Sequence, residues 1–289
     1  MLRRFVCCLM CMALLAPAVL PAWAEEPEDS AARARVAEYA MRIHDYTWEL
    51  PEEKGVLLVY NCNYDPRTSG FRLVFPVWSP YVVYGTVRGV PYSLASYGNG
   101  KELTFEQYQQ LDIEKRIEIS NIFKYLDNGN RVCPRYGMAC ATFVTECLKQ
   151  GLTDPDLPII HGVKTLFGDK KWKRYFDFGK HGRKEYPRLR TGDVMYQDKH
   201  VMLVMENDAE GRRLHVMEQT PPDYAAANCE NMSDVTVTLV YRGKPTTVEA
   251  KRLCMECDAC RQSTTGTQYR WVDYDELGDQ GYVAVFVKY

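Results

Sequence analysis

Hydrophobic positions along the chain switch between a helical period and a strand period. Apolar residues that recur every three to four positions predict helices over residues 31–50 and 140–150. A capping-box pattern at Thr104 and Gln107 opens a polar helix that we expect to extend to residue 126. Short apolar runs bounded by turn residues predict strands over 55–60, 71–78, 81–90, 193–196, 201–205, 214–218, 235–241, 246–250, 268–272 and 282–287.

The order of these elements predicts the fold class. Helices dominate the first half of the chain and strands the second, which favours an α+β fold with an antiparallel sheet. Arg242-Gly243 is expected to turn a hairpin between two of the later strands. Residues 152–190 form a long connection rich in Lys, Arg, Gly and Pro, with a single helical turn expected.

The first 24 residues have the pattern of a secretory signal peptide. Arg3 and Arg4 precede an apolar run over residues 5–20, and Ala22-Trp23-Ala24 offers small residues at the cleavage positions. A transmembrane anchor is the alternative, but the run is short, contains proline and is followed by acidic residues. We therefore expect a secreted or periplasmic protein with no membrane segment after cleavage.

The remaining chain has the composition of a folded globular protein. Hydrophobic residues make up 46% and charged residues 26% of the sequence. The net charge of −2 becomes −4 when residues 1–24 and their two arginines are removed, so a nucleic-acid partner is not expected. We predict one domain over 25–289, with an N-terminal helix and strands over 25–90 and a cysteine-rich insertion over 221–266.

Eight cysteines remain after signal cleavage, and four of them lie in the predicted insertion. Cys254, Cys257 and Cys260 have two overlapping Cys-x-x-Cys spacings, and Cys229 precedes them. These four thiols fit disulfides in an oxidising compartment, a four-thiolate zinc site or a redox dithiol. The spacing favours disulfides and leaves the other two functions open.

Cys140 stands at the start of the predicted helix 140–150, directly after Tyr136-Gly137-Met138-Ala139. A thiol at a helix N-terminus feels the positive end of the helix dipole, which favours the nucleophilic thiolate. Gly137 allows a close approach to the helix start. The alternative is that Cys140 is a small buried hydrophobic residue on the core-facing side of the helix.

A second segment supplies a base and a residue to orient it. His200 stands at the head of an expected strand, and Glu218 stands at the end of the next one. An antiparallel hairpin brings these two positions together. A helix packed on that sheet would bring Cys140 to His200, which gives the nucleophile, base and orienting group of covalent catalysis. Separately, each of the two residues could be a solvent-exposed polar side chain.

Together these motifs resemble the papain-like cysteine peptidases and amidases of bacterial cell-wall turnover, the NlpC-type and CHAP-type enzymes. Cys140, Phe143 and Val144 match the family's nucleophile motif Asp-Cys-Ser-Gly-Phe-Val, while Ala139 and Ala141 replace its Asp and Ser. The family also has a Gly-Asp pair before a strand, a His at the head of the next strand and a polar third residue one strand later. Gly192-Asp193, His200-Val201 and the strand ending in Glu218 match these features.

The resemblance implies a papain-like fold and a Cys140–His200–Glu218 triad. Gln219 and His215 are alternatives to Glu218, because related NlpC-type enzymes use His, Asn or Gln as the third residue. Gly89-Val90-Pro91-Tyr92 is similar to the family's Pro-Tyr segment, in which the tyrosine helps to form the oxyanion hole, so Tyr92 is a further candidate.

The function implied by the resemblance is hydrolysis of an amide bond in peptidoglycan stem peptides or muropeptides, without a cofactor or a catalytic metal. Two alternatives remain at this point. A non-catalytic secreted binding protein would keep the scaffold with Cys140 buried or bridged to Cys133. A thiol-redox or zinc protein would depend on the cysteines at 254–260. The oligomeric state stays open.

Overall fold

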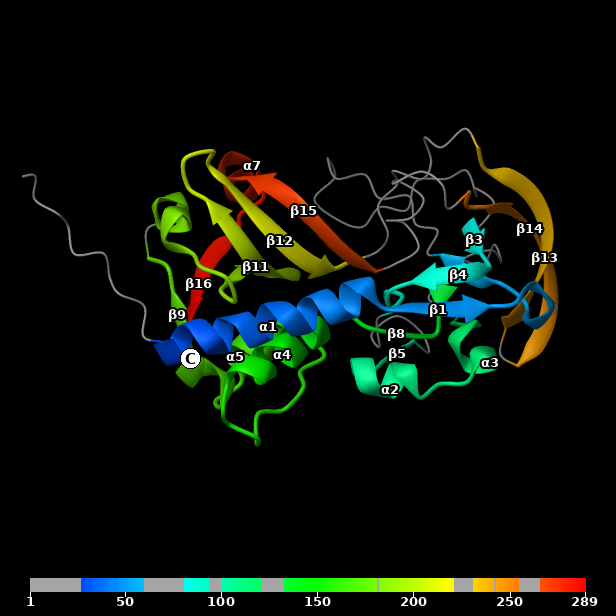
Figure 1. Ribbon diagram of the computed structural model, residues 1–289, viewed down its shortest axis with the longest axis horizontal. Coiled ribbons are helices and arrows are strands. Elements are labelled where there is room, and N and C mark those ends of the chain that lie inside the picture. Colours follow the sequence, from blue (N-terminus) through cyan, green and yellow to red (C-terminus); the bar gives the residue numbers. More distant parts are fainter. Residues whose placement is uncertain are drawn as a thin grey trace, which may run out of the picture.

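The computed structural model of the protein describes residues 27–59, 81–93, 100–120, 133–180, 182–220, 231–241, 243–254 and 266–289. Its elements form two six-stranded sheets, two small two-stranded sheets and several helices. One large sheet lies at one end of the molecule with α1 and α4, and the long hairpin of the other sheet lies at the opposite end (Figure 1). This mixed architecture agrees with the predicted α+β class.

The first large sheet contains five of the seven strands predicted after residue 190, together with β9, which was not predicted. Its order is β15-β12-β11-β10-β16-β9, and every neighbouring pair is antiparallel. The strands are β9 (Phe176–Phe178), β10 (Val194–Gln197), β11 (His200–Asp208), β12 (Arg213–Gln219), β15 (Thr267–Asp273) and β16 (Val283–Val287). Tight turns join β10 to β11 and β11 to β12, so the predicted hairpin that contains His200 and Glu218 is present.

Helices cover one face of this sheet. Helix α4 (Cys140–Gly151) matches the predicted helix 140–150 and contacts β11, β12 and α1 (Pro27–Asp45). Phe143, Val144 and Leu148 of α4 are fully buried in a core with Leu203 and Met217 of the sheet. The apolar period of this helix therefore packs on a sheet face built from alternate residues of each strand.

The opposite face of the sheet has its own smaller core. Met202 and Val204 of β11 pack there with Val216 of β12. Helix α7 (Tyr274–Asp279) and the 3₁₀ segment η3 (Gly182–Arg188) contribute Leu277 and Tyr186. Because both faces are covered, β11 has a continuous apolar run and not an alternating one.

The predicted insertion contributes a long hairpin to a second sheet. Strands β13 (Ser233–Tyr241) and β14 (Lys244–Arg252) form the expected hairpin, and both strands are longer than predicted. They join shorter strands from the first half of the chain in the order β2-β3-β14-β13-β6-β7. Those strands are β2 (Leu57–Val59), β3 (Tyr81–Val83), β6 (Glu118–Ser120) and β7 (Cys133–Pro134).

The predicted helix over 104–126 is wrong in its length. Thr104 and Gln107 form the expected capping box, but helix α2 (Phe105–Gln109) then ends. Asp112 accepts a hydrogen bond from the Lys115 amide and starts a separate short helix, α3 (Ile113–Arg116). The next residues form β6 because they pair with β13, a partner more than 100 positions away in the sequence that local propensity does not reveal.

Other boundaries also differ from the predictions. Helix α1 ends at Asp45 and not at residue 50, because β1 (Thr47–Leu50) pairs with β4 (Gly85–Arg88). The strand expected over 81–90 is divided into β3 and β4. The predicted strand 71–78 lies outside the described residues. The remaining described elements are η1 (Glu52–Lys54), β5 (Lys101–Glu102), β8 (Tyr136–Gly137), α5 (Val163–Gly168) and η2 (Trp172–Tyr175).

The predicted connection 152–190 is more ordered than a loop with a single helical turn. It contains α5, η2, β9 and η3 in succession. Phe167 and Trp172 are buried there, and β9 extends the first sheet by pairing with β16. The composition of this segment predicts a loop because Lys, Arg, Gly and Pro are abundant in it. The few aromatic residues that are buried do not change that composition.

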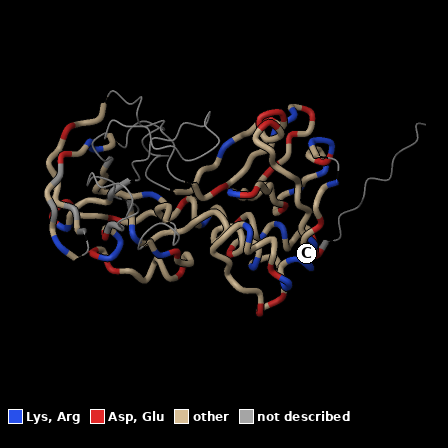
Figure 2. The backbone as a smooth tube through the Cα atoms, turned by 180° about the vertical axis from the view of Figure 1, so that it is seen from behind, with Lys and Arg blue, Asp and Glu red and all other residues tan. Residues whose placement is uncertain are grey.

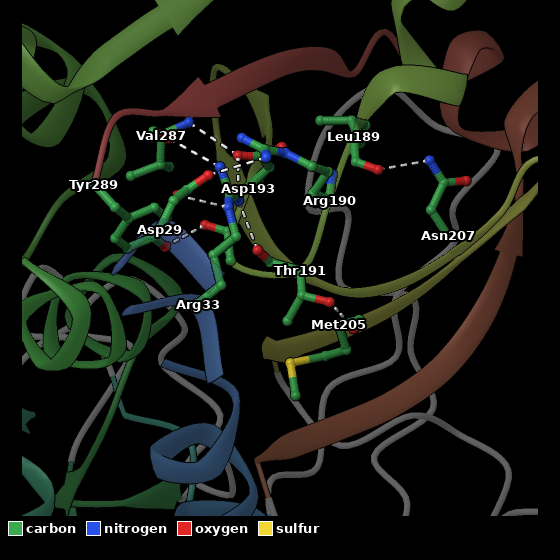
Figure 3. A network of polar contacts seen from close by, with 11 residues as sticks. Asp29, Arg33, Leu189, Arg190, Thr191, Asp193, Met205, Asn207, Val287 and Tyr289 are labelled. Carbon is green, nitrogen blue, oxygen red and sulfur yellow. Dashed lines mark hydrogen bonds and ion pairs between the residues drawn. The ribbon is translucent and has the colours of Figure 1, made fainter. Parts of the chain in front are cut away.

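The Gly192-Asp193 pair has a structural task. Asp193 is fully buried, and it accepts hydrogen bonds from the Arg33 guanidinium at 3.0 Å and from the backbone amides of Arg190 and Val287 (Figure 3). Arg33 lies on α1, and it also donates to the Thr191 carbonyl at 2.7 Å. This network ties the first helix to the turn before β10 and to the end of the chain.

Candidate active site

Cys140 is the first residue of α4, as the sequence predicts. Ala139 in the N-cap position offers no side-chain acceptor to the helix start. The first backbone N–H groups of a helix have no hydrogen-bond acceptor within the helix. The Ala139 side chain supplies none to the N–H groups at the start of α4. Cys140 is 4% exposed, and its thiol forms no disulfide. The predicted alternative in which Cys140 is bridged to Cys133 is therefore wrong.

The segment before Cys140 is held by a close backbone contact. The Met138 amide donates to the Pro91 carbonyl at 2.9 Å, and the Ser93 amide donates to the Met138 carbonyl at 3.2 Å. A Cβ atom at Gly137 would lie 2.2 Å from the Pro91 oxygen, so only glycine fits there. The predicted close approach at Gly137 is therefore present, and the neighbour is the segment that contains Tyr92.

His200 and Glu218 meet at the end of the β11–β12 hairpin. The His200 Nε2 atom lies 2.5 Å from Glu218 Oε2, and the two side chains are 17% and 5% exposed. The Cys140 thiol lies close enough to the same imidazole ring to raise the pKa of His200. With Nε2 directed at the carboxylate, Nδ1 is the ring nitrogen left for the thiol. The structure therefore brings Cys140, His200 and Glu218 into one line of contacts.

The charges in this line favour an ionised histidine. Burial by itself would lower the pKa of His200, but the neighbouring Cys140 and Glu218 outweigh it and raise the pKa to about 10. Burial by itself would raise the pKa of Glu218, but His200 and Arg270 outweigh it and lower the pKa to about 2. At neutral pH the Glu218 carboxylate is therefore ionised and the His200 imidazole is protonated.

Tyr92 lies beside the segment that precedes Cys140, with its backbone paired to Met138. It is 7% exposed. Two hydrogen bonds hold the chain just before Tyr92. The Val90 carbonyl accepts from the Gln219 side-chain amide at 2.8 Å and from the Gly266 backbone amide at 3.1 Å. The predicted role of the Tyr92 hydroxyl in stabilising an oxyanion stays a prediction.

The two alternatives to Glu218 have other partners. Gln219 is fully buried, and its carbonyl oxygen accepts from the Thr267 hydroxyl at 2.8 Å. The ring of His215 is stacked between Tyr269 and Trp271, with centroid distances of 3.7 and 4.5 Å. Strand alternation separates both residues from Glu218, and of the three candidates it is Glu218 whose carboxylate contacts His200.

Three neighbours of the site were not found by the sequence analysis. Arg270 donates from Nε to Glu218 Oε1 at 2.9 Å. The Tyr282 ring packs edge-on against His200 with 6.5 Å between centroids, and its hydroxyl accepts from Gln197 Nε2 at 3.1 Å. Arg270 lies on an expected strand. Because 47 residues separate Gln219 from Thr267, the sequence does not indicate which strand pairs with it.

A polar cluster lies next to Cys140 on α4. The Thr142 hydroxyl donates to Glu102 Oε2 at 2.7 Å and lies 3.0 Å from His161 Nδ1. His161 is half exposed, while Glu102 is buried. The hydrogen bond with Glu102 raises the pKa of His161. No sequence motif predicts this cluster, because its three residues come from separate segments of the chain.

The cysteine cluster of the insertion is described only in part. Cys229, Cys257 and Cys260 lie outside the described residues, as does Cys62, so the choice between disulfides, zinc and redox chemistry stays open. Within the described ranges, no group of three or more His, Cys, Asp or Glu side chains could hold a metal ion. The predicted signal peptide also lies outside the described residues.

The distribution of charge and hydropathy bears on partners. Lys and Arg are interspersed with Asp and Glu along the described backbone (Figure 2). No helix within the described part of the chain is long and apolar enough to cross a membrane. Comparisons with protein-family models, with curated proteins and with solved structures find no match for this chain.

Proposed function

We propose that the protein is a secreted cysteine hydrolase of papain-like fold that cleaves an amide or peptide bond through Cys140, His200 and Glu218. One observation supports this proposal above all others. The imidazole of His200 lies 2.5 Å from the Glu218 carboxylate, and the nearby Cys140 thiol helps to raise its pKa. Nucleophile, base and orienting acid in this order are the arrangement that covalent acyl transfer requires.

The chemical steps follow from these contacts. The Cys140 sulfur attacks the carbonyl carbon of the substrate, and the imidazolium of His200 gives its proton to the departing amine. Glu218 holds the ring and stabilises its positive charge. The thioester is then hydrolysed by a water molecule from which neutral His200 takes a proton. The free sulfur returns to its starting state, so the atoms balance over one cycle.

The oxyanion of each tetrahedral intermediate needs hydrogen-bond donors. The backbone N–H of Cys140 stands in the first turn of α4, which has no side-chain cap from Ala139. The positive end of the helix dipole adds to the stabilisation of negative charge at this position. Tyr92 is a second donor candidate, because its backbone pairs with Met138 two residues before the nucleophile.

The proposed substrates are peptidoglycan stem peptides or soluble muropeptides. This choice depends on the resemblance of Cys140, Gly192-Asp193 and His200 to the cell-wall enzymes and on the signal-peptide pattern of residues 1–24. A net charge of −4 after cleavage offers no long-range attraction to anionic wall polymers, so soluble muropeptides are as good a proposal as the intact wall.

A non-catalytic binding protein is the second candidate. The observation that favours it is the low exposure of Cys140, which is 4%. A thiol that substrate cannot reach would only pack in the hydrophobic core. Cys140, His200 and Glu218 would then have no catalytic role. The ion pair of His200 with Glu218 opposes this candidate. Burying two charges has a desolvation cost, which a protein without catalytic function has no reason to retain.

Site-resolved alkylation tests the proposal. The mature protein is treated with limiting iodoacetamide at mildly acidic pH and mapped by peptide analysis, with His200→Ala and His215→Ala as matched variants. Selective modification of Cys140 that falls in His200→Ala but not in His215→Ala is expected, and muropeptide digestion by the wild type should be lost in Cys140→Ser. An unreactive Cys140 in the wild type would contradict the proposal and favour the binding protein.

A further inference from the structure

The Glu218 carboxylate is shared between two cationic partners on opposite sides. Its Oε2 atom lies 2.5 Å from His200 Nε2, and its Oε1 atom accepts from Arg270 Nε at 2.9 Å. Arg270 lies on β15, the edge strand of the sheet next to β12. We propose that Arg270 is a positioning residue that fixes the Glu218 carboxylate and sets the pH range over which His200 exchanges its proton. This inference rests on the proposed function.

The first part of the argument is geometric. Glu218 is 5% exposed, so a carboxylate oxygen without a partner there would lose its hydration and gain nothing in return. Arg270 occupies Oε1 and thereby prevents the carboxylate from turning away from the imidazole. A charged hydrogen bond of this kind is stronger than one between neutral groups, so it holds the rotamer of Glu218 firmly.

The second part is electrostatic. The guanidinium keeps Glu218 ionised, since it contributes to the lowered pKa of this carboxyl group. It also opposes the positive charge on His200 from the far side of the same carboxylate. Without Arg270, the full attraction of Glu218 would act on the imidazolium and make its proton harder to remove.

The opposing effects of Glu218 and Arg270 on the His200 charge matter because His200 must exchange its proton during the reaction. The ring must be protonated to release the amine and neutral to activate water for hydrolysis of the thioester. A carboxylate with no opposing charge would keep His200 in the imidazolium form and slow the second step. Arg270 therefore moves the titration of His200 towards the pH at which both steps can run.

A purely structural task for Arg270 is the alternative. Arg270 also lies 3.7 Å from Glu276 on α7, so it could simply join β15 to that helix. A structural ion pair would change the stability of the protein when it is removed, but it would leave the titration of His200 where it is. The pH at which His200 titrates therefore separates the two explanations.

NMR titration of the histidine rings provides the test. The chain has five histidines, and His200→Gln assigns the signal of His200 by its disappearance. Arg270→Gln keeps a hydrogen-bond donor but removes the charge, while Arg270→Lys keeps the charge. Arg213→Gln is the matched control, because Arg213 donates from Nε to Asp208 at 2.9 Å and lies on the adjacent strand with similar exposure.

The expected result is an upward shift of the His200 midpoint by about half to one pH unit in Arg270→Gln. Arg270→Lys and Arg213→Gln should leave it close to the wild-type value. A downward shift is expected in Glu218→Gln, which shows that the signal reports the carboxylate. If Arg270→Gln does not fold, Arg270→Met keeps the aliphatic stem and takes its place.

Two outcomes separate this inference from the proposed function. If Cys140 alkylation depends on His200 while Arg270→Gln leaves the His200 midpoint unchanged, the role of Arg270 is wrong and the proposed function stands. If Cys140 alkylation does not depend on His200, the proposed function fails, whatever the midpoint does. A downward shift of the midpoint in Arg270→Gln would also overturn the role of Arg270.

Discussion

Arg33 on the first helix and Asp193 in the turn before β10 form a buried ion pair, 3.0 Å apart, across 160 positions of sequence. Their side chains are 4% and 0% exposed. Asp193 belongs to the Gly-Asp pair that the resemblance singled out. Its contacts give this pair the task of anchoring α1 against the sheet that contains His200, and not a direct part in the proposed chemistry.

Arg33→Ala should destabilise the protein by about 3–5 kcal/mol, because it leaves the buried charge of Asp193 without its partner. Chemical denaturation of the wild type and the variant measures this difference. Arg35→Ala is the matched control on the same helix, since Arg35 is exposed and donates to the Gln150 carbonyl. That variant should lose at most about 0.5 kcal/mol. Equal losses in the two variants would contradict the anchoring role.

Gly192→Ala should destabilise the protein for two separable reasons. Gly192 has a φ of 86°, where a side chain costs about 1–2 kcal/mol. A Cβ atom there would also lie 2.4 Å from the Tyr289 hydroxyl oxygen. A double-mutant cycle with Tyr289→Phe separates the terms, because the closest contact is removed in that background, the nearest ring carbon stays at 3.2 Å and the φ cost remains. Equal costs of Gly192→Ala in both backgrounds would exclude the clash.

Glu218→Gln should reduce the rate of Cys140 alkylation at neutral pH and lower hydrolysis by roughly two orders of magnitude or more. The carboxylate raises the pKa of His200, so its loss should move the alkaline limb of the pH–rate profile downward. Glu206→Gln is the control, because Glu206 is an exposed acid on the adjacent strand β11. A profile that keeps its midpoints in Glu218→Gln would show that this carboxylate does not act on His200.

His161 should stabilise the protein more in acid than in alkali. The hydrogen bond with Glu102 raises its pKa, so the stabilisation is present in full below the usual value of about 6.5. It is lost as the pH rises through the folded-state pKa. The stability lost in His161→Gln should therefore be larger at about pH 5.5 than at about pH 9, by chemical denaturation at both values.

His44 offers a contrast of opposite sign. Burial lowers the pKa of this histidine, so protonation at low pH works against the folded state. His44→Gln should gain stability relative to the wild type as the pH falls below about 6.5. If both histidine variants change in the same direction with pH, the cause is not the pKa of either residue.

The sequence was sufficient for those features that depend on local pattern. The helix that starts at Cys140 and the hairpin that contains His200 and Glu218 follow from periodicity and turn residues, and both occur with boundaries close to the predicted ones. Antiparallel geometry then brings a residue at the head of one strand to the end of the next. The contact between His200 and Glu218 could therefore be predicted, because both residues lie on one short hairpin.

Tertiary structure decided everything that joins distant segments. The extended strand at residues 118–120 exists because β13 pairs with it, and the helix expected there is absent for the same reason. Arg270 reaches Glu218 only because β15 pairs with β12 after a separation of 47 residues. Periodicity shows which face of an element is apolar, but strand neighbours depend on the free energy of the whole assembled sheet. That is why the sequence alone indicated a Cys–His–Glu line and could not indicate the arginine behind it.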